Sequence, residues 1–441
     1  MEIKRYLGRQ ADLDRRPLIT GSEAGIRRVV VIPVLAEERS LYGTLDSLSR
    51  CGEADLDQTL IVCVVNNRAA PDESESRIRE NLATLGTLRA WVDGADGGGR
   101  CTMGDGALRL ALVDAASPGN ELASHEGVGT ARKIGLDLGL RLLHENGMED
   151  GLLINLDADT LVEPNYLAEI GRFFSDRGSG AAVVAYEHPL DGPEEERDAI
   201  LCYELFLRYH LMGLQLARSP YAYTAIGSTI VCTAAAYASV SGMSRKRAGE
   251  DFYFLEKLAK TVAVDSITGT KVFPAARPST RVPFGTGPRV DAYMAGSREG
   301  TLFFHPASYE VLGGWLSLIS DRADEEAAQI YGAASTVCPA LPAFLDEIRF
   351  RKIWPRLQEN APGPNILMKQ FHRWFDALKT LQLLNHLRDN GYPKQEMYAS
   401  VRRMLRICGF HLVQFDWRGI ESDPQIPVNL LGFLRRRSGN L

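Results

Sequence analysis

Short apolar runs alternate with amphipathic stretches along the first half of the chain. Five runs are rich in Val, Ile, Leu and Ala, a composition typical of buried strands in a parallel or mixed sheet. They lie at residues 28–33, 60–65, 108–113, 151–156 and 181–187. The first run closes with Pro33, which cannot continue a hydrogen-bonded ladder.

Helical periodicity fills the intervals between these runs. Helices are predicted at residues 38–50, 74–85, 125–146, 163–174, 197–217 and 249–260. This alternation of strand and helix predicts an α/β protein, with a Rossmann-like mixed β-sheet flanked by helices. Residues 93–106 hold six glycines, so we expect a loop or an insertion there.

The pattern changes near residue 290, where long helical stretches replace the alternation. At 441 residues the chain is too long for one ordinary domain. We therefore predict an N-terminal extension at 1–26, an α/β domain at 27–290 and a C-terminal helical region at 291–441. The helical region is expected to shape a substrate site or the subunit interface of a homo-oligomer.

Composition narrows the class of protein. Lys and Arg total 50 against 56 Asp and Glu, so no basic excess indicates a nucleic-acid partner. The seven cysteines are scattered and form no Cys-X-X-Cys, which favours free thiols in a cytoplasmic protein. The uncharged run 219–244 holds Pro and Gly and is a poor membrane helix, so no transmembrane segment is expected. The apolar and then basic tail, 430–437, suits either peripheral contact with an anionic membrane or a frayed terminus.

Asp157 and Asp159 follow the fourth apolar run directly. The carboxyl end of such a strand is where open α/β sheets bind ligands. Two carboxylates one residue apart suit Mg²⁺ or Mn²⁺, which prefer oxygen ligands and keep coordination positions for water and phosphates. A turn or helix cap also uses Asp and Thr at such a place, so the pair alone decides nothing.

Four further motifs accompany this pair in a consistent order. Pro33 to Glu38 looks like Pro-X-X-Asn-Glu-Glu, and residues 127–135 resemble Gly-X-X-X-Ala-Arg-Asn-X-Gly. Ser241-Gly242-Met243 and then Glu250-Asp251 resemble Gly-Gly-Phe followed by Glu-Asp. Asn66-Asn67 ends the second strand, where Asp-Asp-Gly-Ser is usual. Together with Leu156-Asp157-Ala158-Asp159, these motifs resemble the family-2 nucleotide-sugar glycosyltransferases of the GT-A fold over about residues 28–264.

The resemblance implies a role for each position. Asp251 becomes the general base that deprotonates an acceptor hydroxyl, and Glu250 shapes the acceptor site. Asp159 becomes the direct metal ligand, with Asp157 as a second ligand or nearer the sugar. A UDP- or GDP-linked sugar is expected to contact residues from several segments: Pro33, Glu37, Asn66, Asn67, Arg132, Lys133 and Asp157. Glu37, Arg132 and Lys133 are otherwise ordinary charges at helix starts.

Several positions leave alternatives open. Asn66 or Asn67 replaces the usual base-reading aspartate, and Asn can both accept and donate, so another base could be bound. Arg281 or Arg289, in a Gly/Pro-rich loop, is a candidate for closing over a diphosphate. His305 is a candidate metal ligand or a structural residue. The alternative functions are a catalytically inactive nucleotide-sugar-binding protein and a sugar nucleotidyltransferase, although no Gly-X-Gly-X-Arg phosphate loop follows the first strand.

Overall fold

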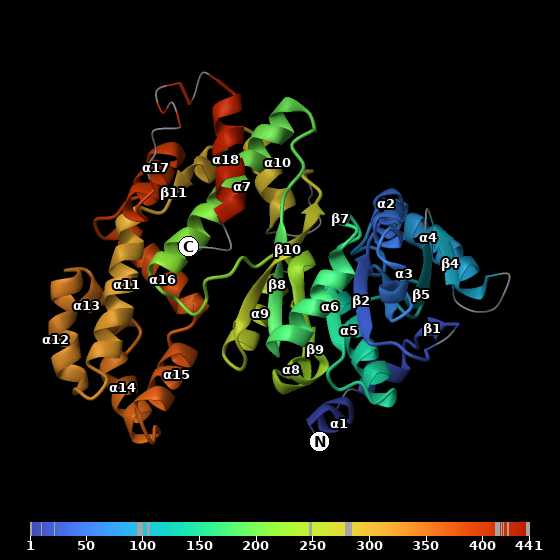
Figure 1. The fold of residues 1–441 in the computed structure, drawn as a ribbon, viewed down its shortest axis with the longest axis horizontal. Coiled ribbons are helices and arrows are strands. Elements are labelled where there is room, and N and C mark those ends of the chain that lie inside the picture. The colour runs from blue at the N-terminus through green and yellow to red at the C-terminus, as the bar shows by residue number, and fades with distance from the viewer. Residues whose placement is uncertain are drawn as a thin grey trace. The chain divides into compact units, whose positions relative to one another are not determined.

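The computed structural model describes the chain apart from residues 1, 10, 22, 95–99, 104–105, 247–248, 278–284, 411–414, 416, 418, 421–422 and 438–441. The chain forms two compact units. Unit 1 comprises Met1–Pro189 and Ala225–Pro288, and unit 2 comprises Leu190–Thr224 and Arg289–Leu441. Each unit is described below by itself (Figure 1).

Unit 1 is built on a mixed ten-stranded sheet with the order β1-β5-β3-β2-β6-β9-β8-β10-β7, in which β4 also pairs with β5. Strands β5, β3, β2 and β6 are mutually parallel, whereas β9 is antiparallel to its neighbours β6 and β8. The strands are β1 (Ile19–Thr20), β2 (Arg28–Val34), β3 (Thr59–Asn66), β4 (Arg100–Met103), β5 (Gly106–Ala115), β6 (Leu152–Asn155), β7 (Thr160–Val162), β8 (Ala181–Tyr186), β9 (Ile230–Thr233) and β10 (Val264–Pro274).

Helices flank this sheet. They are α1 (Glu2–Leu7), α2 (Glu38–Ser49), α3 (Glu53–Leu56), α4 (Glu75–Asp93), α5 (Val128–Glu145), α6 (Tyr166–Arg177), α8 (Ala234–Ser239) and α9 (Glu250–Ala259). The central strands β2 and β3 are almost wholly buried, because they are covered on both faces. The predicted α/β class, a Rossmann-like mixed sheet flanked by helices, is confirmed.

Four local differences from the sequence pattern have physical causes. The glycine-rich segment is not wholly a loop, because Arg100–Met103 forms β4 and pairs antiparallel with β5. Strand β10 was not predicted, since its eleven residues include Gly, Thr and Lys and its exposed positions interrupt the apolar pattern. Strand β2 continues through Pro33 to Val34, and its ladder with β6 has already ended at Val31. Residues 2–7 form a docked helix rather than a free arm, with Ile3 and Tyr6 buried.

Unit 2 is mainly helical. Its core gathers Trp315, Phe350, Trp354 and Phe371, all fully buried. A short two-stranded antiparallel sheet pairs β11 (Leu302–Phe303) with β12 (Gln395–Glu396). Its helices are α7 (Glu194–Leu216), α11 (Pro306–Asp321), α12 (Ala327–Val337), α13 (Leu341–Glu347), α14 (Phe350–Glu359), α15 (Pro364–Trp374), α16 (Ala377–Asp389), α17 (Met397–Ile407) and α18 (Gln425–Arg437). Helix α10 (Thr286–Met294) contains the sequence boundary between the units.

Unit 2 is built from two separate stretches of the chain. Helix α7 lies within the span 27–290 but belongs to unit 2. Its apolar face, including Leu205 and Tyr209, packs with Phe303 and Tyr309, so its burial is completed by residues about 100 positions later in the chain. A buried ion cluster adds to this packing, because Glu204 bonds both Arg208 and Arg435.

The C-terminal tail is part of the same packing. Leu430, Leu431 and Leu434 on α18 are buried in the core of unit 2. They are therefore not presented as an apolar surface for a membrane. Across the described parts of both units, no helix combines the length and the apolar character needed to cross a bilayer.

Candidate active site

The Asp-X-Asp pair lies in the turn that joins β6 to β7. Strand β6 is buried at every position, and the chain turns directly after it. Two hydrogen bonds fix the turn: Leu156 N–H donates to the Val31 carbonyl at 3.1 Å, and Thr44 Oγ1 donates to the Ala158 carbonyl at 2.9 Å. Asp157 and Asp159 are therefore held at the carboxyl edge of the sheet, where a parallel arrangement of strands leaves room for a ligand.

Glu250 and Asp251 are the first two residues of α9. Gly249 precedes them with φ +70°, a left-handed conformation that a residue with a side chain adopts only at a cost. The Asp251 carboxylate accepts a hydrogen bond from the Phe252 N–H at 2.8 Å, and Glu250 is almost fully buried. The start of a helix favours negative charge, so both carboxylates are suited to this position.

Arg132, in the first turns of α5, joins the two acidic segments. Its Nη2 lies 2.5 Å from Asp157 Oδ1 and its Nε lies 3.3 Å from Glu250 Oε1. Its Nη1 donates to the Gly227 carbonyl at 2.8 Å. The side chain of Arg132 is only 5% exposed, whereas that of Asp157 keeps 30%. The segments 157–159 and 250–251 therefore meet around one buried guanidinium.

Two glycines make this arrangement sterically feasible. A Cβ on Gly129 would lie 2.4 Å from the Lys246 carbonyl oxygen and 3.0 Å from Glu250 Cβ, so the segment before α9 can approach α5 only at glycine. A Cβ on Gly227 would lie 2.2 Å from Nη2 of Arg132. The Gly-X-Ala-Arg pattern at 129–132 thus combines a close backbone approach with the arginine that uses it.

The carboxylates have perturbed acidities. Burial raises the pKa of Glu250 to about 7, despite the nearby charge of Arg132. Burial also raises the pKa of Asp251 and of Asp157, with Arg132 again opposing the change. Burial of Arg132 itself disfavours its charge, but Asp157, Glu250 and Asp251 outweigh this effect and raise its pKa. A carboxylate with a raised pKa is a stronger proton acceptor, which suits a general base.

Glu37 and Asp159 share a second arginine. The guanidinium of Arg277 bonds the Glu37 carboxylate and lies 3.0 Å from Asp159 Oδ2. Strand β10 delivers Arg277, because β10 pairs with β7 and the Ala275 N–H donates to the Asp159 carbonyl at 3.1 Å. Sequence reasoning missed Arg277 and named Arg281 and Arg289 instead. The only sequence signal for Arg277 is that it lies a few residues before Arg281, next to the same Gly/Pro-rich segment.

Asn66 and Asn67 are buried at the end of β3. Asn81 of α4 donates to the Asn66 carbonyl at 3.0 Å and to Asn67 Oδ1 at 2.9 Å. The same side chain accepts from the N–H of Ala36, whose φ of +50° is strained for a residue other than glycine. Asn81 thereby connects the end of β3 to the loop that carries Glu37. Pro33 lies on the preceding strand, half-buried.

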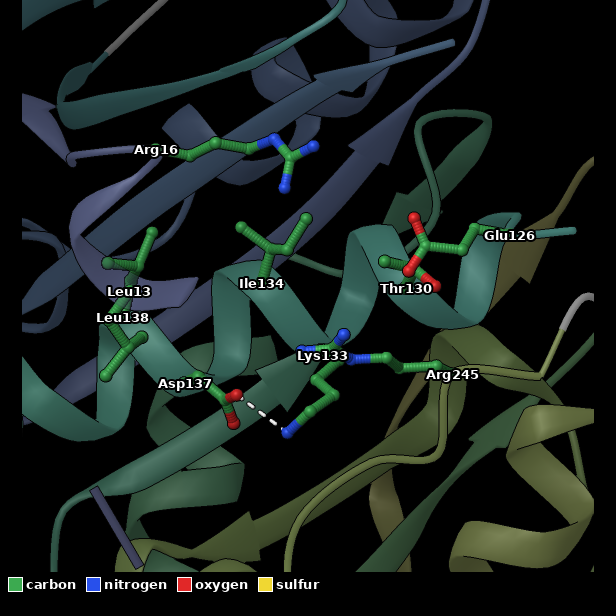
Figure 2. A pocket seen from close by; sticks show the side chains of 9 residues that line it. All are labelled: Leu13, Arg16, Glu126, Thr130, Lys133, Ile134, Asp137, Leu138 and Arg245. Carbon is green, nitrogen blue, oxygen red and sulfur yellow. Dashed lines mark hydrogen bonds and ion pairs between the residues drawn. The ribbon is translucent and has the colours of Figure 1, made fainter. Parts of the chain in front are cut away.

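Lys133 points away from the carboxylates that Arg132 contacts. Its Nζ lies 2.7 Å from Asp137 Oδ2 and donates to the Tyr6 hydroxyl at 2.6 Å. The hydroxyls of Tyr6 and Tyr237 both donate to Asp137 Oδ1 at 2.7 Å. Figure 2 shows Lys133 and Asp137 among the side chains that line a pocket, together with Arg245. Neighbouring residues on α5 thus serve two different sites, and Lys133 is not brought to Asp157.

The remaining candidates lie elsewhere. His305 is in unit 2, where its Nδ1 accepts from the Ala307 N–H and caps α11. Arg289 is exposed on α10 and also belongs to unit 2, and Arg281 lies outside the described residues. Within the described ranges no three His, Cys, Asp or Glu side chains cluster as a complete metal site. The carboxylates of Asp157, Asp159 and Glu37 are instead paired with arginines: Asp157 with Arg132, and Asp159 and Glu37 with Arg277.

Comparison with known proteins gives similarity to solved structures alone. No protein-family model matches the chain. No curated protein matches it either. Among solved structures, the chain is similar to residues 1–349 of S. aureus TarS in complex with UDP-GlcNAc, at 12% identity and a TM-score of 0.39, over 83% of this chain and 93% of that one. It is also similar to the mannosyltransferase PcManGT of Pyrobaculum calidifontis in complex with GDP-Man and Mn²⁺, at 14% identity and a TM-score of 0.35, over 84% and 94% of the two chains.

Proposed function

We propose that the protein is an inverting, metal-dependent glycosyltransferase that moves a sugar from a nucleoside-diphosphate sugar to an acceptor hydroxyl. The observation that supports this proposal is the meeting of Asp157 and Glu250 at Arg132, with Asp251 beside them. Glycosyl transfer needs both a polar donor site and a general base, and the two acidic segments supply carboxylates for each.

The proposed step balances as a single displacement. The acceptor hydroxyl gives its proton to Asp251 as its oxygen bonds to the anomeric carbon, and the bond from that carbon to the diphosphate oxygen breaks. The raised pKa of Asp251 strengthens it as the proton acceptor. Glu250, held by Arg132, shapes the acceptor side, whereas Glu37 and Arg132 belong to the donor side with Asn66, Asn67, Pro33 and Asp157.

A divalent cation fits the donor side chemically. Asp159 and Asp157 offer hard oxygen ligands, and the guanidinium of Arg277, 3.0 Å from Asp159 Oδ2, supports the idea that a positive charge can approach this carboxylate. Mg²⁺ or Mn²⁺ bound there would neutralise the charge that develops on the diphosphate leaving group. Two protein carboxylates suffice, because such cations keep several waters and phosphate oxygens as ligands.

The proposal is tested by combining binding with turnover. UDP- and GDP-linked sugars are screened with Mn²⁺ for thermal stabilisation, because a ligand bound only to the folded state raises the melting temperature. Release of nucleoside diphosphate from the stabilising donor is then measured, with water or an added alcohol as acceptor. Asp251→Asn should lower this rate by about 10²–10⁴-fold while donor stabilisation persists. Asp176→Asn, on the exposed side of α6, serves as the matched control.

Each contrary result has a defined meaning. Stabilisation by nucleotides without turnover would favour a nucleotide-sugar-binding protein, for which the internal bonding of Asn66 and Asn67 is the supporting feature. Release of pyrophosphate from a nucleoside triphosphate would indicate a sugar nucleotidyltransferase. Full turnover by Asp251→Asn would refute the proposed base.

A further inference from the structure

A guanidinium occupies the place between Asp159 and Glu37. Arg277 bonds the Glu37 carboxylate and lies 3.0 Å from Asp159 Oδ2, so one cation neutralises two acidic side chains from different segments. The Glu37 side chain is only 7% exposed, and that of Asp159 keeps 27%. Without a counter-charge, two carboxylates so close together would repel each other in a poorly solvated place.

The main chain brings Arg277 to this position. The last residues of β10 pair with β7, with Pro274 opposite Thr160, and Ala275 is bonded to the Asp159 carbonyl. Arg277 therefore follows the anchored strand by only three residues. Its side chain is 37% exposed, so it lies at the edge of the site rather than within a packed core.

From this geometry we propose that Arg277 competes with the divalent cation for Asp159 and Glu37, and is displaced when the cation binds. The inference rests on the proposed function, because it concerns the metal of that same site. A divalent ion and a guanidinium cannot both lie on the Asp159 oxygen that faces Arg277, and each satisfies the same negative charge. Arg277 thus stabilises the metal-free site and lowers its apparent affinity for metal.

If Arg277 competes with the cation, removing its charge should strengthen metal binding rather than weaken it. Arg277→Gln removes the competing charge but keeps a polar side chain of similar reach. Mn²⁺ should then bind several-fold more tightly, whereas an arginine that merely supported the site would give weaker binding when removed. Because binding and stability are linked, two changes in melting temperature should accompany the tighter binding. Without metal, Arg277→Gln should melt at a lower temperature than the wild type. Added Mn²⁺ should raise the melting temperature of Arg277→Gln more than that of the wild type.

The experiment measures Mn²⁺ binding by electron paramagnetic resonance and thermal unfolding in the absence of nucleotide. Four proteins are compared: the wild type, Arg277→Gln, Asp159→Asn and Arg351→Gln. Arg351 is the matched control, since it is exposed in unit 2 and pairs with a single aspartate, Asp346, at 2.8 Å. The expected order of Mn²⁺ affinity is Arg277→Gln above the wild type and the control, with Asp159→Asn lowest.

The outcomes separate this inference from the proposed function. Unchanged or weaker Mn²⁺ binding by Arg277→Gln, together with loss of binding in Asp159→Asn, would overturn the competition and leave the metal site in place. Mn²⁺ binding that survives Asp159→Asn unchanged, or no binding by the wild type and Arg277→Gln alike, would refute a metal site formed by the protein alone and with it the competition. Donor turnover independent of added metal would identify the second case separately.

Discussion

The Nε atom of Arg132 lies 3.3 Å from Oε1 of Glu250, and this contact joins the first turns of α5 to the first turn of α9. Because Arg132 also bonds Asp157, the carboxyl edge of the sheet and the start of α9 share one counter-ion. A charge shared in this way makes stability and site geometry depend on the same side chain.

Removing that counter-ion should be costly. Arg132→Met leaves Asp157 and Glu250 without a partner in a buried position, and loss of one member of a buried pair typically costs about 3–5 kcal/mol. We expect a decrease near the lower end of this range at pH 8, measured by urea unfolding, and a smaller decrease at pH 5, where the carboxyl groups can take up protons. Arg132→Met/Glu250→Gln should recover part of the loss. Equal losses at both pH values would contradict the electrostatic explanation.

The pH dependence of stability should carry the signature of Glu250. Its pKa rises from an ordinary 4.5 to about 7 on folding, so the folded state binds more protons between these values. The free energy of unfolding should therefore decrease as the pH rises from about 4.5 to 7. Glu250→Gln removes this contribution. The free energy of unfolding of the wild type, measured with urea across this window, should therefore decrease relative to that of the variant as the pH rises. A difference that is independent of pH would show that Glu250 has the same pKa in both states.

Gly129 should tolerate no side chain. In Gly129→Ala the new methyl group would meet the Lys246 carbonyl at 2.4 Å, so α5 and the segment before α9 must separate. Overpacking of this kind costs about 1–3 kcal/mol, and donor turnover should fall with it because Glu250 and Asp251 move. Gly86→Ala is the matched control: it lies in helix α4 with no atom within 4 Å of the new Cβ. There the higher helix propensity of alanine should stabilise the protein by up to about 1 kcal/mol.

The hydroxyl of Tyr6 should contribute measurably to the stability of unit 1. It donates to Asp137 and accepts from Lys133 in a buried network. Tyr6→Phe leaves part of that network unsatisfied and should cost about 1–3 kcal/mol in urea unfolding. Tyr42→Phe, whose hydroxyl donates to Glu38 at a partly exposed position, should leave stability nearly unchanged. Equal effects of the two substitutions would refute a special role for the buried network.

The parts of this fold that were predictable from sequence are those with strong local patterns. The buried runs of β2, β3 and β6 and the turn at Asp157 and Asp159 could be located because burial on both faces leaves few polar residues in a strand. Strand β10 could not, since its position beside β7 and β8 comes from tertiary pairing and its residues alternate irregularly. Arg277 was missed for the same reason, as only that pairing brings it to Asp159.

The chemical motifs show a similar limit. The neighbours Arg132 and Lys133 have equivalent sequence signals, but the rotation of a helix by one residue sends one side chain to Asp157 and the other to Asp137. Asn81 was not identified at all, because a lone asparagine in a polar helix carries no mark of its bonds to Asn66 and Ala36. Periodicity locates elements, whereas side-chain direction depends on neighbours that are distant in sequence.

Unit 1 is formed by two separate stretches of the chain, and this arrangement has a consequence for biosynthesis. Residues 190–224, which belong to unit 2, are made before β9, α9 and β10 of unit 1. A ribosome therefore releases α7 while neither its own packing partners nor the missing strands of the first unit have emerged. Early folding of the N-terminal half should stall with the β6 edge open, and its apolar surface should attract chaperones until translation passes residue 274.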